Sequence, residues 1–238
     1  MKEWREGAHY ILHDPEAMPS PRPELFSAAH WKSLDKVEGT APGRGAVAFV
    51  RGGPRGQVWA VRHYRRGGQV GRWIEDSYLW TGLAATRPWR EFQLTHVLRG
   101  QRLPVPRPVA AHVVRSGLGY RGDLITERIE GAEPLAQLLE RQPLPVEQWT
   151  GLGRVLRRFH DAGVRHDDVN ARNLLRDAHG QFHLIDFDKA RVLPAGAWRA
   201  QNLARFRRSL DKFKAAAAGF HFTDVEWTVL MSGYDARS

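Results

Sequence analysis

Apolar and polar residues alternate with the period of an α-helix just before position 163. Apolar side chains recur at spacings of three, four and seven positions, at Leu152, Val155, Leu156 and Phe159. Arginine and aspartate occupy most of the positions between them, which predicts a helix that buries one face. Gly163 then follows, where many helices end in the left-handed conformation that suits glycine. The pattern therefore predicts a buried helix that leads directly into residues 164–173.

Other segments show patterns typical of strands and of a second helix. Residues 46–51 and 57–64 are rich in apolar residues and flank a glycine- and proline-containing stretch, which predicts a β-hairpin. Residues 124–131 predict a buried strand that runs into a linker. Between these segments, residues 90–98 carry apolar positions at helical spacing, and the proline-rich stretch 104–108 ends that helix.

Residues suited to catalysis are concentrated in one stretch. It contains His166-Asp167-Asp168, then Asn173, then two short apolar-rich runs around an Asp/Gly turn, and finally Asp186. Phosphoryl transfer needs a carboxylate beside the acceptor hydroxyl and oxygen ligands for Mg²⁺ beside the phosphates. Asp168 fits the first role as the catalytic base, whereas Asn173 and Asp186 fit the second as metal ligands. Asp167 is the alternative base, but only Asp168 stands two positions after His166 and five before Asn173.

This order of residues resembles the catalytic core of the protein-kinase-like fold. The resemblance implies an α+β, bilobal fold with a β-rich N-lobe and a reduced, mainly helical C-lobe. We expect a lead-in at 1–24, a nucleotide-binding N-lobe at 25–128, and a C-lobe at 129–238 with the catalytic loop, the metal site and a basic helix. Each motif alone also occurs by chance, and it is their order around a predicted hairpin that favours the kinase-like interpretation.

A kinase-like N-lobe would bind ATP at its first hairpin. Gly43 and Gly45 would let the backbone approach the phosphates closely, and Val47 would contact the base. Arg62 is the candidate cation for the phosphates, at a position where protein kinases have lysine, and Glu91 would pair with it. The alternative for Arg62 is an edge-strand arginine that faces solvent.

The segment after the buried strand 124–131 corresponds to the hinge that meets adenine in kinase-like proteins. Glu127 and Ile129 are the candidate hinge residues. The chain after Asp186 is short and contains no Ala-Pro-Glu sequence, so the long activation segment and the peptide-docking lobe of protein kinases lack room. We therefore expect a small or membrane-presented acceptor.

Composition and charge narrow the class of partner. The chain of 238 residues has no cysteine and a formal net charge of +10. Lack of cysteine excludes disulfides, thiolate metal sites and cysteine nucleophiles, so a bound metal should be a hard cation held by oxygen. Neither a membrane-spanning stretch nor a signal-peptide core is recognisable, so a cytoplasmic location is expected. The charge favours an anionic partner, although a basic surface without any ligand is the alternative.

Further motifs resemble the bacterial 3-deoxy-D-manno-octulosonic acid (Kdo) kinase family over roughly residues 25–215. They are Arg-His-Tyr-x-Arg-Gly-Gly at 62–68, the Asp168/Asn173 loop, and the segments 103–108, 126–129, 185–189 and 202–205. The resemblance implies an ATP-dependent enzyme of lipopolysaccharide core biosynthesis. Its acceptor would be the 4-hydroxyl of the Kdo sugar on a lipid A precursor, and Asp168 would be its base. It also implies peripheral association with the cytoplasmic face of the inner membrane.

The motifs leave several alternatives open. A lipopolysaccharide heptose kinase, or another small-molecule kinase of the same fold, would share every catalytic residue. A nucleotide-binding regulator without catalysis is less favoured, because Asp168, Asn173 and Asp186 occur together. Nucleic-acid binding is not expected, since no nucleic-acid motif is present and the basic residues are dispersed. No motif indicates the oligomeric state.

One segment near the C-terminus combines an apolar stripe with many basic residues. Leu203, Phe206, Leu210 and Phe213 lie on one helical face, which predicts packing of that face in the C-lobe. We expect the basic residues around the stripe to face anionic lipid headgroups, together with two arginines after the second strand. These residues are Arg205, Arg207, Arg208, Lys212, Lys214, Arg65 and Arg66.

Overall fold

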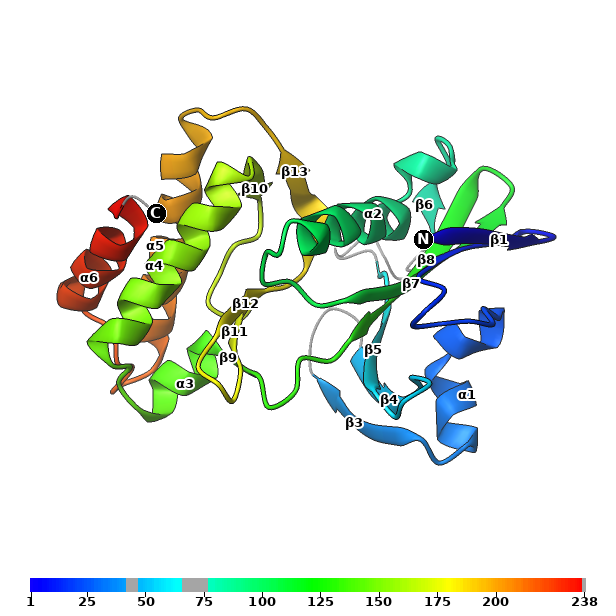
Figure 1. Cartoon of the computed structure of the whole chain (residues 1–238), viewed down its shortest axis with the longest axis horizontal. Coiled ribbons are helices and arrows are strands. Elements are labelled where there is room, and N and C mark those ends of the chain that lie inside the picture. The colour runs from blue at the N-terminus through cyan, green and yellow to red at the C-terminus, as the bar shows by residue number, and fades with distance from the viewer. Residues whose placement is uncertain (42–46, 66–76, 237–238) are drawn as a thin grey trace. The chain divides into compact units, whose positions relative to one another are not determined.

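Figure 1 shows the computed structural model of the chain, which describes residues 1–41, 47–65 and 77–236. The residues form two units. One unit comprises Met1–Leu98 together with Pro106–Arg128, and the other comprises Arg99–Val105 together with the chain from Ile129 onward. The first unit is mainly β-sheet, and the second is mainly helical.

The first unit is built on an antiparallel sheet. Its strand order is β1-β2-β7-β8-β5-β4-β3, and β6 pairs with the start of β8. The described strands are β1 (Lys2–Glu6), β2 (His9–His13), β3 (Val37–Ala41), β4 (Val47–Arg51), β5 (Val58–His63), β6 (Tyr78–Leu79), β7 (Pro108–Ser116) and β8 (Gly119–Glu127). The helical elements of this unit are η1 (Pro23–Phe26), α1 (Ala28–Ser33), η3 (Leu83–Ala85) and α2 (Arg87–Gly100).

The strands confirm several expectations drawn from the sequence. In the β4–β5 hairpin Val47 pairs with Arg62 and Arg51 pairs with Val58, as predicted for residues 46–51 and 57–64. The buried strand expected from residue 124 onward is the second half of β8. Residues in the expected lead-in supply β1 and β2, and β2 pairs with β7 at the sheet.

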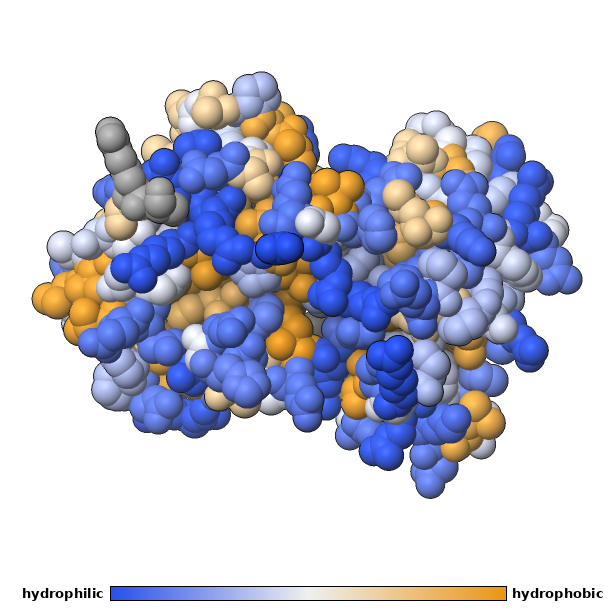
Figure 2. All heavy atoms as spheres, in the orientation of Figure 1, coloured by the Kyte–Doolittle hydropathy of each residue, from blue (hydrophilic) through white to orange (hydrophobic). Residues whose placement is uncertain are grey.

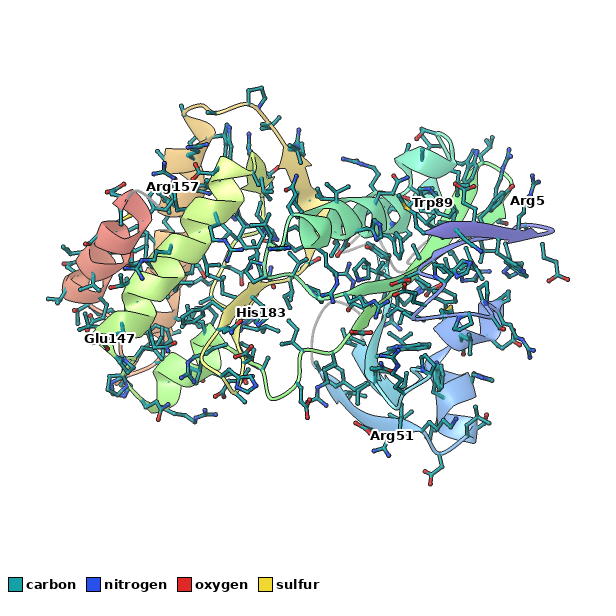
Figure 3. All side chains as sticks on the ribbon, in the orientation of Figure 1. Arg5, Arg51, Trp89, Glu147, Arg157 and His183 are labelled. Atoms are coloured by element: carbon teal, nitrogen blue, oxygen red, sulfur yellow. The ribbon has the colours of Figure 1, made fainter. Side chains whose placement is uncertain are left out.

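Each face of this sheet packs against a hydrophobic core. Successive side chains of a strand point to opposite faces. The neighbours Leu124 and Ile125 of β8 accordingly enter different hydrophobic cores. The core around Ile125 contains Trp31 of α1, and the core around Leu124 contains Trp89 of α2. Trp89 is labelled in Figure 3, near the N-terminal end of α2. The core around Leu124 fixes α2 against one face of the sheet, which positions the residues on that face of β5.

The second unit contains the longest helices. Its elements are β9 (Glu133–Pro134), α3 (Leu135–Arg141), α4 (Val146–Asp161), β10 (Val164–His166), β11 (Leu174–Arg176), β12 (Phe182–Leu184), η4 (Phe187–Lys189), β13 (Ala190–Val192), α5 (Trp198–Ala216) and α6 (Asp224–Asp235). Two small antiparallel sheets, β12-β11-β9 and β10-β13, accompany the helices. Leu174 pairs with Leu184 in the β11–β12 hairpin, so the predicted hairpin between the candidate catalytic loop (residues 166–173) and Asp186 is confirmed.

Helices α4 and α6 approach each other closely at two glycines, and Figure 1 shows them side by side. A Cβ atom at Gly153 would lie 2.0 Å from the carbonyl oxygen of Leu230, and one at Gly233 would lie 2.2 Å from that of Thr150. Any larger residue would therefore force the helices apart. This contact fixes α4, whose C-terminal end leads into β10 and the catalytic loop.

The stripe predicted for α4 is largely buried, as expected. Leu152, Leu156 and Phe159 are buried, and Val155 is half-buried. Gly163 has a φ of +75°, the predicted left-handed conformation after the helix. The periodicity of the sequence thus predicts both the buried face of α4 and the residue at which the chain turns.

The predicted α+β organisation, with a β-rich N-terminal part and a helical C-terminal part, is confirmed. None of the helices in the described ranges is both long enough and apolar enough to cross a membrane. Hydrophilic residues cover most of the face shown in Figure 2.

Candidate active site

The loop between β10 and β11 is held by hydrogen bonds that converge on Asp168. The backbone amide of Asp168 donates to Nδ1 of His166 at 3.3 Å. Its backbone carbonyl accepts from the side-chain amides of Asn170 at 2.8 Å and Asn173 at 2.9 Å. Asn170 also accepts from the backbone amide of Arg172 at 2.8 Å through its carboxamide oxygen. These bonds define the backbone on both sides of the Asp168 carboxylate.

His166 connects this loop to the segment that carries Asp186. Its Nε2 donates to the carbonyl oxygen of Ile185 at 3.1 Å, which leaves Nδ1 as the acceptor for the Asp168 amide. The side chain is buried, and its ring lies 5.2 Å from that of Phe187. Burial lowers the pKa of His166, so the neutral tautomer that these two bonds require is the favoured form.

The two neighbouring aspartates have different partners. One oxygen of Asp167 lies 2.6 Å from Nε of Arg165 on β10, and the other lies 3.1 Å from the guanidinium of Arg191 on β13. Asp167 therefore links the two strands of one small sheet. Oδ1 of Asp168 instead lies 2.6 Å from the guanidinium of Arg205 on α5, and 38% of its side chain is exposed. Of the two carboxylates, that of Asp168 is the more accessible to a substrate.

The candidate metal ligands lie at one end of the β11–β12 hairpin. The carbonyl oxygen of Asn173 accepts from the backbone amide of Ile185 at 3.0 Å, so Asn173 lies opposite the residue before Asp186. Asp186 has a φ of +66°, a left-handed conformation that is uncommon outside glycine and is often found at functional sites. A carboxamide oxygen and a carboxylate are ligands that fit Mg²⁺. In the described part of the chain, no cluster of three or more acidic or histidine side chains is arranged as a metal site.

The first unit contains the candidate phosphate-binding pair. Val61 points into the core on the α1 side of the sheet, so Arg62 faces the side that α2 covers. The Arg62 guanidinium forms an ion pair with the carboxylate of Glu91, whose side chain is 4% exposed. The expected pairing is therefore present, and the solvent-facing alternative for Arg62 is wrong, although phosphate binding itself stays a prediction.

Tyr64 completes this group and was not singled out from the sequence. Its hydroxyl donates to the Glu91 carboxylate and accepts from Arg62 at 2.9 Å. The Arg62 guanidinium also lies over the Tyr64 ring, 4.7 Å from its centroid. Tyr64 stands two positions after Arg62 on the same side of the strand, so period-two spacing is a signal that could have identified it.

The remaining candidate residues are placed as follows. Val47 begins β4 and pairs directly with Arg62. Glu127 ends β8, where its amide donates to the carbonyl of Arg107 at 2.8 Å, and Ile129 is the first residue of the second unit after that strand. Gly43 and Gly45 lie outside the described residues. The structure leaves the nucleotide-binding roles of all these residues as predictions.

A polar chain within the second unit supports the catalytic loop. The Tyr234 hydroxyl on α6 donates to Nδ1 of His160 at 2.7 Å, and Nε2 of His160 donates to the carboxamide oxygen of Asn202 at 3.2 Å. The Asn202 amide then donates to the carbonyl of His166 at 2.8 Å. Burial, reinforced by the nearby Arg199 and Arg157, lowers the pKa of His160 to about 4. His160 is therefore neutral in this series of hydrogen bonds. Arg157, which is labelled in Figure 3, lies on α4 together with His160.

Helix α5 contacts the candidate catalytic loop through three of its side chains. Besides Asn202 and Arg205, the Ser209 hydroxyl accepts from the backbone amide of Ala171 at 3.1 Å. The basic residue Arg207 is paired with Asp211 at 3.0 Å and with Asp224 at 2.5 Å. Arg205 and Arg207, both expected to face lipid, are thus engaged with carboxylates of the protein. Sequence reasoning named segment 202–205 as a family motif and Arg205 as a lipid-facing residue. It did not predict that positions 202, 205 and 209, which share helical spacing, contact the loop.

Comparisons with known proteins agree with the motifs. The family model described as "Lipopolysaccharide kinase (Kdo/WaaP) family" matches residues 28–234. A 3-deoxy-D-manno-octulosonic acid kinase of Photobacterium profundum is 42% identical over 225 residues, which cover 94% of each chain. The protein of the same name from Vibrio parahaemolyticus is 39% identical over 230 residues, covering 97% of this chain and 95% of the relative. A protein of this name from Haemophilus influenzae is 36% identical over 244 residues, covering 98% of this chain and 99% of the relative. The resemblance that the motifs indicated is confirmed.

Proposed function

We propose that this chain, which belongs to the lipopolysaccharide kinase (Kdo/WaaP) family, is an ATP-dependent kinase of the Kdo sugar in lipopolysaccharide core biosynthesis. The observation that carries the proposal is the half-exposed Asp168 carboxylate, in a loop whose backbone is fixed by His166, Asn170 and Asn173. The names of the relatives support a sugar acid as acceptor. The 4-hydroxyl of Kdo on a lipid A precursor is the acceptor group that we assign.

The proposed reaction is direct transfer of the γ-phosphoryl group of ATP. The acceptor oxygen forms a bond to the γ-phosphorus while the bond from that phosphorus to the β–γ bridging oxygen breaks, and ADP leaves with the bonding electrons. The hydroxyl proton of the acceptor passes to the carboxylate of Asp168. Positioning and charge neutralisation supply most of the catalysis in this class of reaction, so a rigid loop around the base is the expected requirement.

We assign separate roles to the candidate residues for the metal, the phosphates and the base. Asn173 and Asp186 would bind Mg²⁺, which neutralises charge on the phosphates when bound. The Arg62 guanidinium, positioned by Glu91 and Tyr64, would supply the positive charge that contacts the phosphates. Gly43, Gly45 and Val47 would approach the nucleotide from the segment before β4, and Glu127 and Ile129 would contact adenine through their backbone.

The acceptor suggests a location. A lipid A precursor is held in a membrane, and the net charge of +10 favours an anionic surface. The exposed basic residues Arg208, Lys212 and Lys214 on α5 are the candidates for contact with acidic headgroups. We therefore infer peripheral association with the cytoplasmic face of the inner membrane.

The proposal is tested by an acceptor panel. The purified protein is incubated with Mg²⁺ and γ-labelled ATP, together with Kdo-lipid A, heptosylated core or free sugars. We expect label in Kdo-lipid A, and much less in free sugars. Label that appears only in heptosylated core, and that NMR locates on a heptose, would instead assign the chain as a heptose kinase. Label released only as inorganic phosphate would contradict a kinase of either kind.

A further inference from the structure

We propose that Arg205 is a positioning residue for phosphoryl transfer, which holds the Asp168 carboxylate in the orientation that receives the acceptor proton. This inference rests on the proposed function and assigns a role to a residue outside the catalytic loop. The guanidinium of Arg205 lies 2.6 Å from Oδ1 of Asp168. A charge-assisted hydrogen bond of this length is strong and directional.

The contact is of a kind that contributes little to folding. The side chains of Arg205 and Asp168 are 46% and 38% exposed, and ion pairs at such exposure stabilise proteins only weakly because water screens them. Its main consequence is therefore local, on the orientation of one carboxylate. The neighbouring ion pair is different. Arg165 of β10 pairs with Asp167, which directly follows that strand, whereas Arg205 pairs with Asp168.

The helix that carries Arg205 is fixed to the loop on both sides of Asp168. Asn202 donates to the carbonyl of His166 at 2.8 Å, and Ser209 accepts from the amide of Ala171 at 3.1 Å. Positions 202, 205 and 209 are three and four residues apart, so their side chains share one face of α5. Their partners follow in the same order along the loop. Arg205 thus extends from a helix whose register with the loop is set by its two neighbours.

This arrangement distinguishes the two oxygens of the base. A carboxylate can rotate about its last side-chain bond, and a fixed partner on one oxygen restricts that rotation. With Oδ1 held by Arg205, Oδ2 is the oxygen that we assign to the acceptor hydroxyl. Placement of the base to within a fraction of an ångström strongly affects the rate of proton and phosphoryl transfer.

The first test replaces Arg205 by methionine, which removes the charge and retains much of the side-chain length. We expect Arg205→Met to lower kcat for Kdo-lipid A about tenfold or more, with the KM for ATP changed by less than about twofold. Arg205→Lys should recover part of the loss, because it restores a donor without the forked geometry. Arg154→Met, at an exposed arginine on α4, is the matched control and should retain wild-type kinetics and Tm.

A double-mutant cycle separates positioning from a general structural effect. In the Asp168→Asn background, Arg205→Met should cost less than about twofold in kcat, because the group that it positions no longer acts as a base. An equal loss in both backgrounds, a near-normal kcat of Arg205→Met, or a change confined to the KM of the acceptor would each overturn the inference while the proposed function stands. A wild-type protein that phosphorylates none of the acceptors would overturn both.

Discussion

Arg62 on β5 and Glu91 on α2 form an ion pair in which the Glu91 side chain is 4% exposed and the Arg62 side chain is 22% exposed. The Tyr64 hydroxyl shares the same carboxylate. The resemblance to kinase-like proteins predicts such a pair, with arginine in place of their lysine. The buried carboxylate needs these partners, because an unpaired charge in such a site is costly.

Loss of the Arg62 guanidinium should impair nucleotide binding and catalysis together. We expect Arg62→Ala to raise the KM for ATP and to lower kcat, by on the order of 10²-fold in kcat/KM. Arg62→Lys should recover part of the activity, since lysine supplies a point charge without the fork. Steady-state kinetics with ATP as the varied substrate measure both effects. Wild-type kinetics of Arg62→Ala would remove Arg62 from phosphate binding, and Arg51→Ala, at an exposed arginine on β4, serves as control.

The two adjacent aspartates should differ sharply in their effects. Asp168→Asn should lower kcat by about 10²–10⁴-fold, the usual contribution of a general base, while ATP affinity stays nearly unchanged. Asp167→Asn weakens only the pairs with Arg165 and Arg191 and should retain kcat within about threefold. Single-turnover transfer and ATP-binding titrations of both variants check this expectation. Near-normal turnover by Asp168→Asn would exclude it as the base.

Substitution of the two proposed metal ligands should reduce activity to different extents. Asn173→Ala and Asp186→Ala should each reduce Mg²⁺-dependent activity by at least about tenfold, with the larger loss for Asp186 because it contributes a full negative charge. Activity is measured as a function of Mg²⁺ concentration at fixed ATP. Equal activity with and without divalent metal would refute the assignment of both residues.

His160 should make stability depend on pH below neutrality. Burial lowers its pKa from 6.5 to about 4, so the unfolded chain binds more protons than the folded one between these values. The contribution of neutral His160 to the free energy of unfolding is therefore fully present above pH 6.5, and it falls as the pH is lowered towards 4. The loss from this residue is about 2 kcal/mol between pH 7 and pH 5.

Denaturant unfolding at the two pH values measures this dependence. His160→Gln should show a smaller loss than the wild type, although some dependence should remain because the pKa of His166 is also lowered. His179→Gln, at an exposed histidine, is the control and should behave as the wild type. An unchanged pH dependence in His160→Gln would show that this residue is not the group responsible.

Membrane association should depend on the exposed basic residues of α5. The triple variant Arg208→Glu, Lys212→Glu, Lys214→Glu should bind acidic vesicles far more weakly, because each basic residue near such a surface contributes on the order of 1 kcal/mol. A control with the same change in charge replaces Lys2, Arg55 and Arg121, which are exposed in the first unit. Flotation at low and high salt measures the binding, which salt should release. Equal binding of the wild type to neutral and acidic vesicles would contradict this electrostatic association.

Local spacing in the sequence predicts much of the catalytic loop. His166 and Asn173 each contact the backbone of Asp168 within one short loop, so their order along the chain reflects their geometry. The buried face of α4 and the turn at Gly163 follow from periodicity and from backbone sterics for the same reason. The pairing of Arg62 with Glu91 needed the kinase-like resemblance as well, because the two residues lie on different elements.

Local spacing does not predict contacts between elements that are distant in the sequence. The pattern of α5 shows which face is apolar, but it does not show that Arg205 meets Asp168 or that Arg207 meets Asp224, since each pair joins separate segments. The same holds for the close approach of α4 and α6 at Gly153, where no periodic signal marks the glycine. The strands of residues 2–13 were also missed, because the proline-rich stretch after them suggested a lead-in.

The position of the transferred phosphate tests the central claim most directly. Kdo-lipid A is phosphorylated by the wild-type protein with ATP and Mg²⁺, and the product is analysed by NMR to locate the new phosphate ester. The account predicts one phosphate at the 4-hydroxyl of the Kdo sugar, formed by the wild type and almost absent with Asp168→Asn. A phosphate on another sugar or on the lipid A part, or equal product from Asp168→Asn, would contradict it.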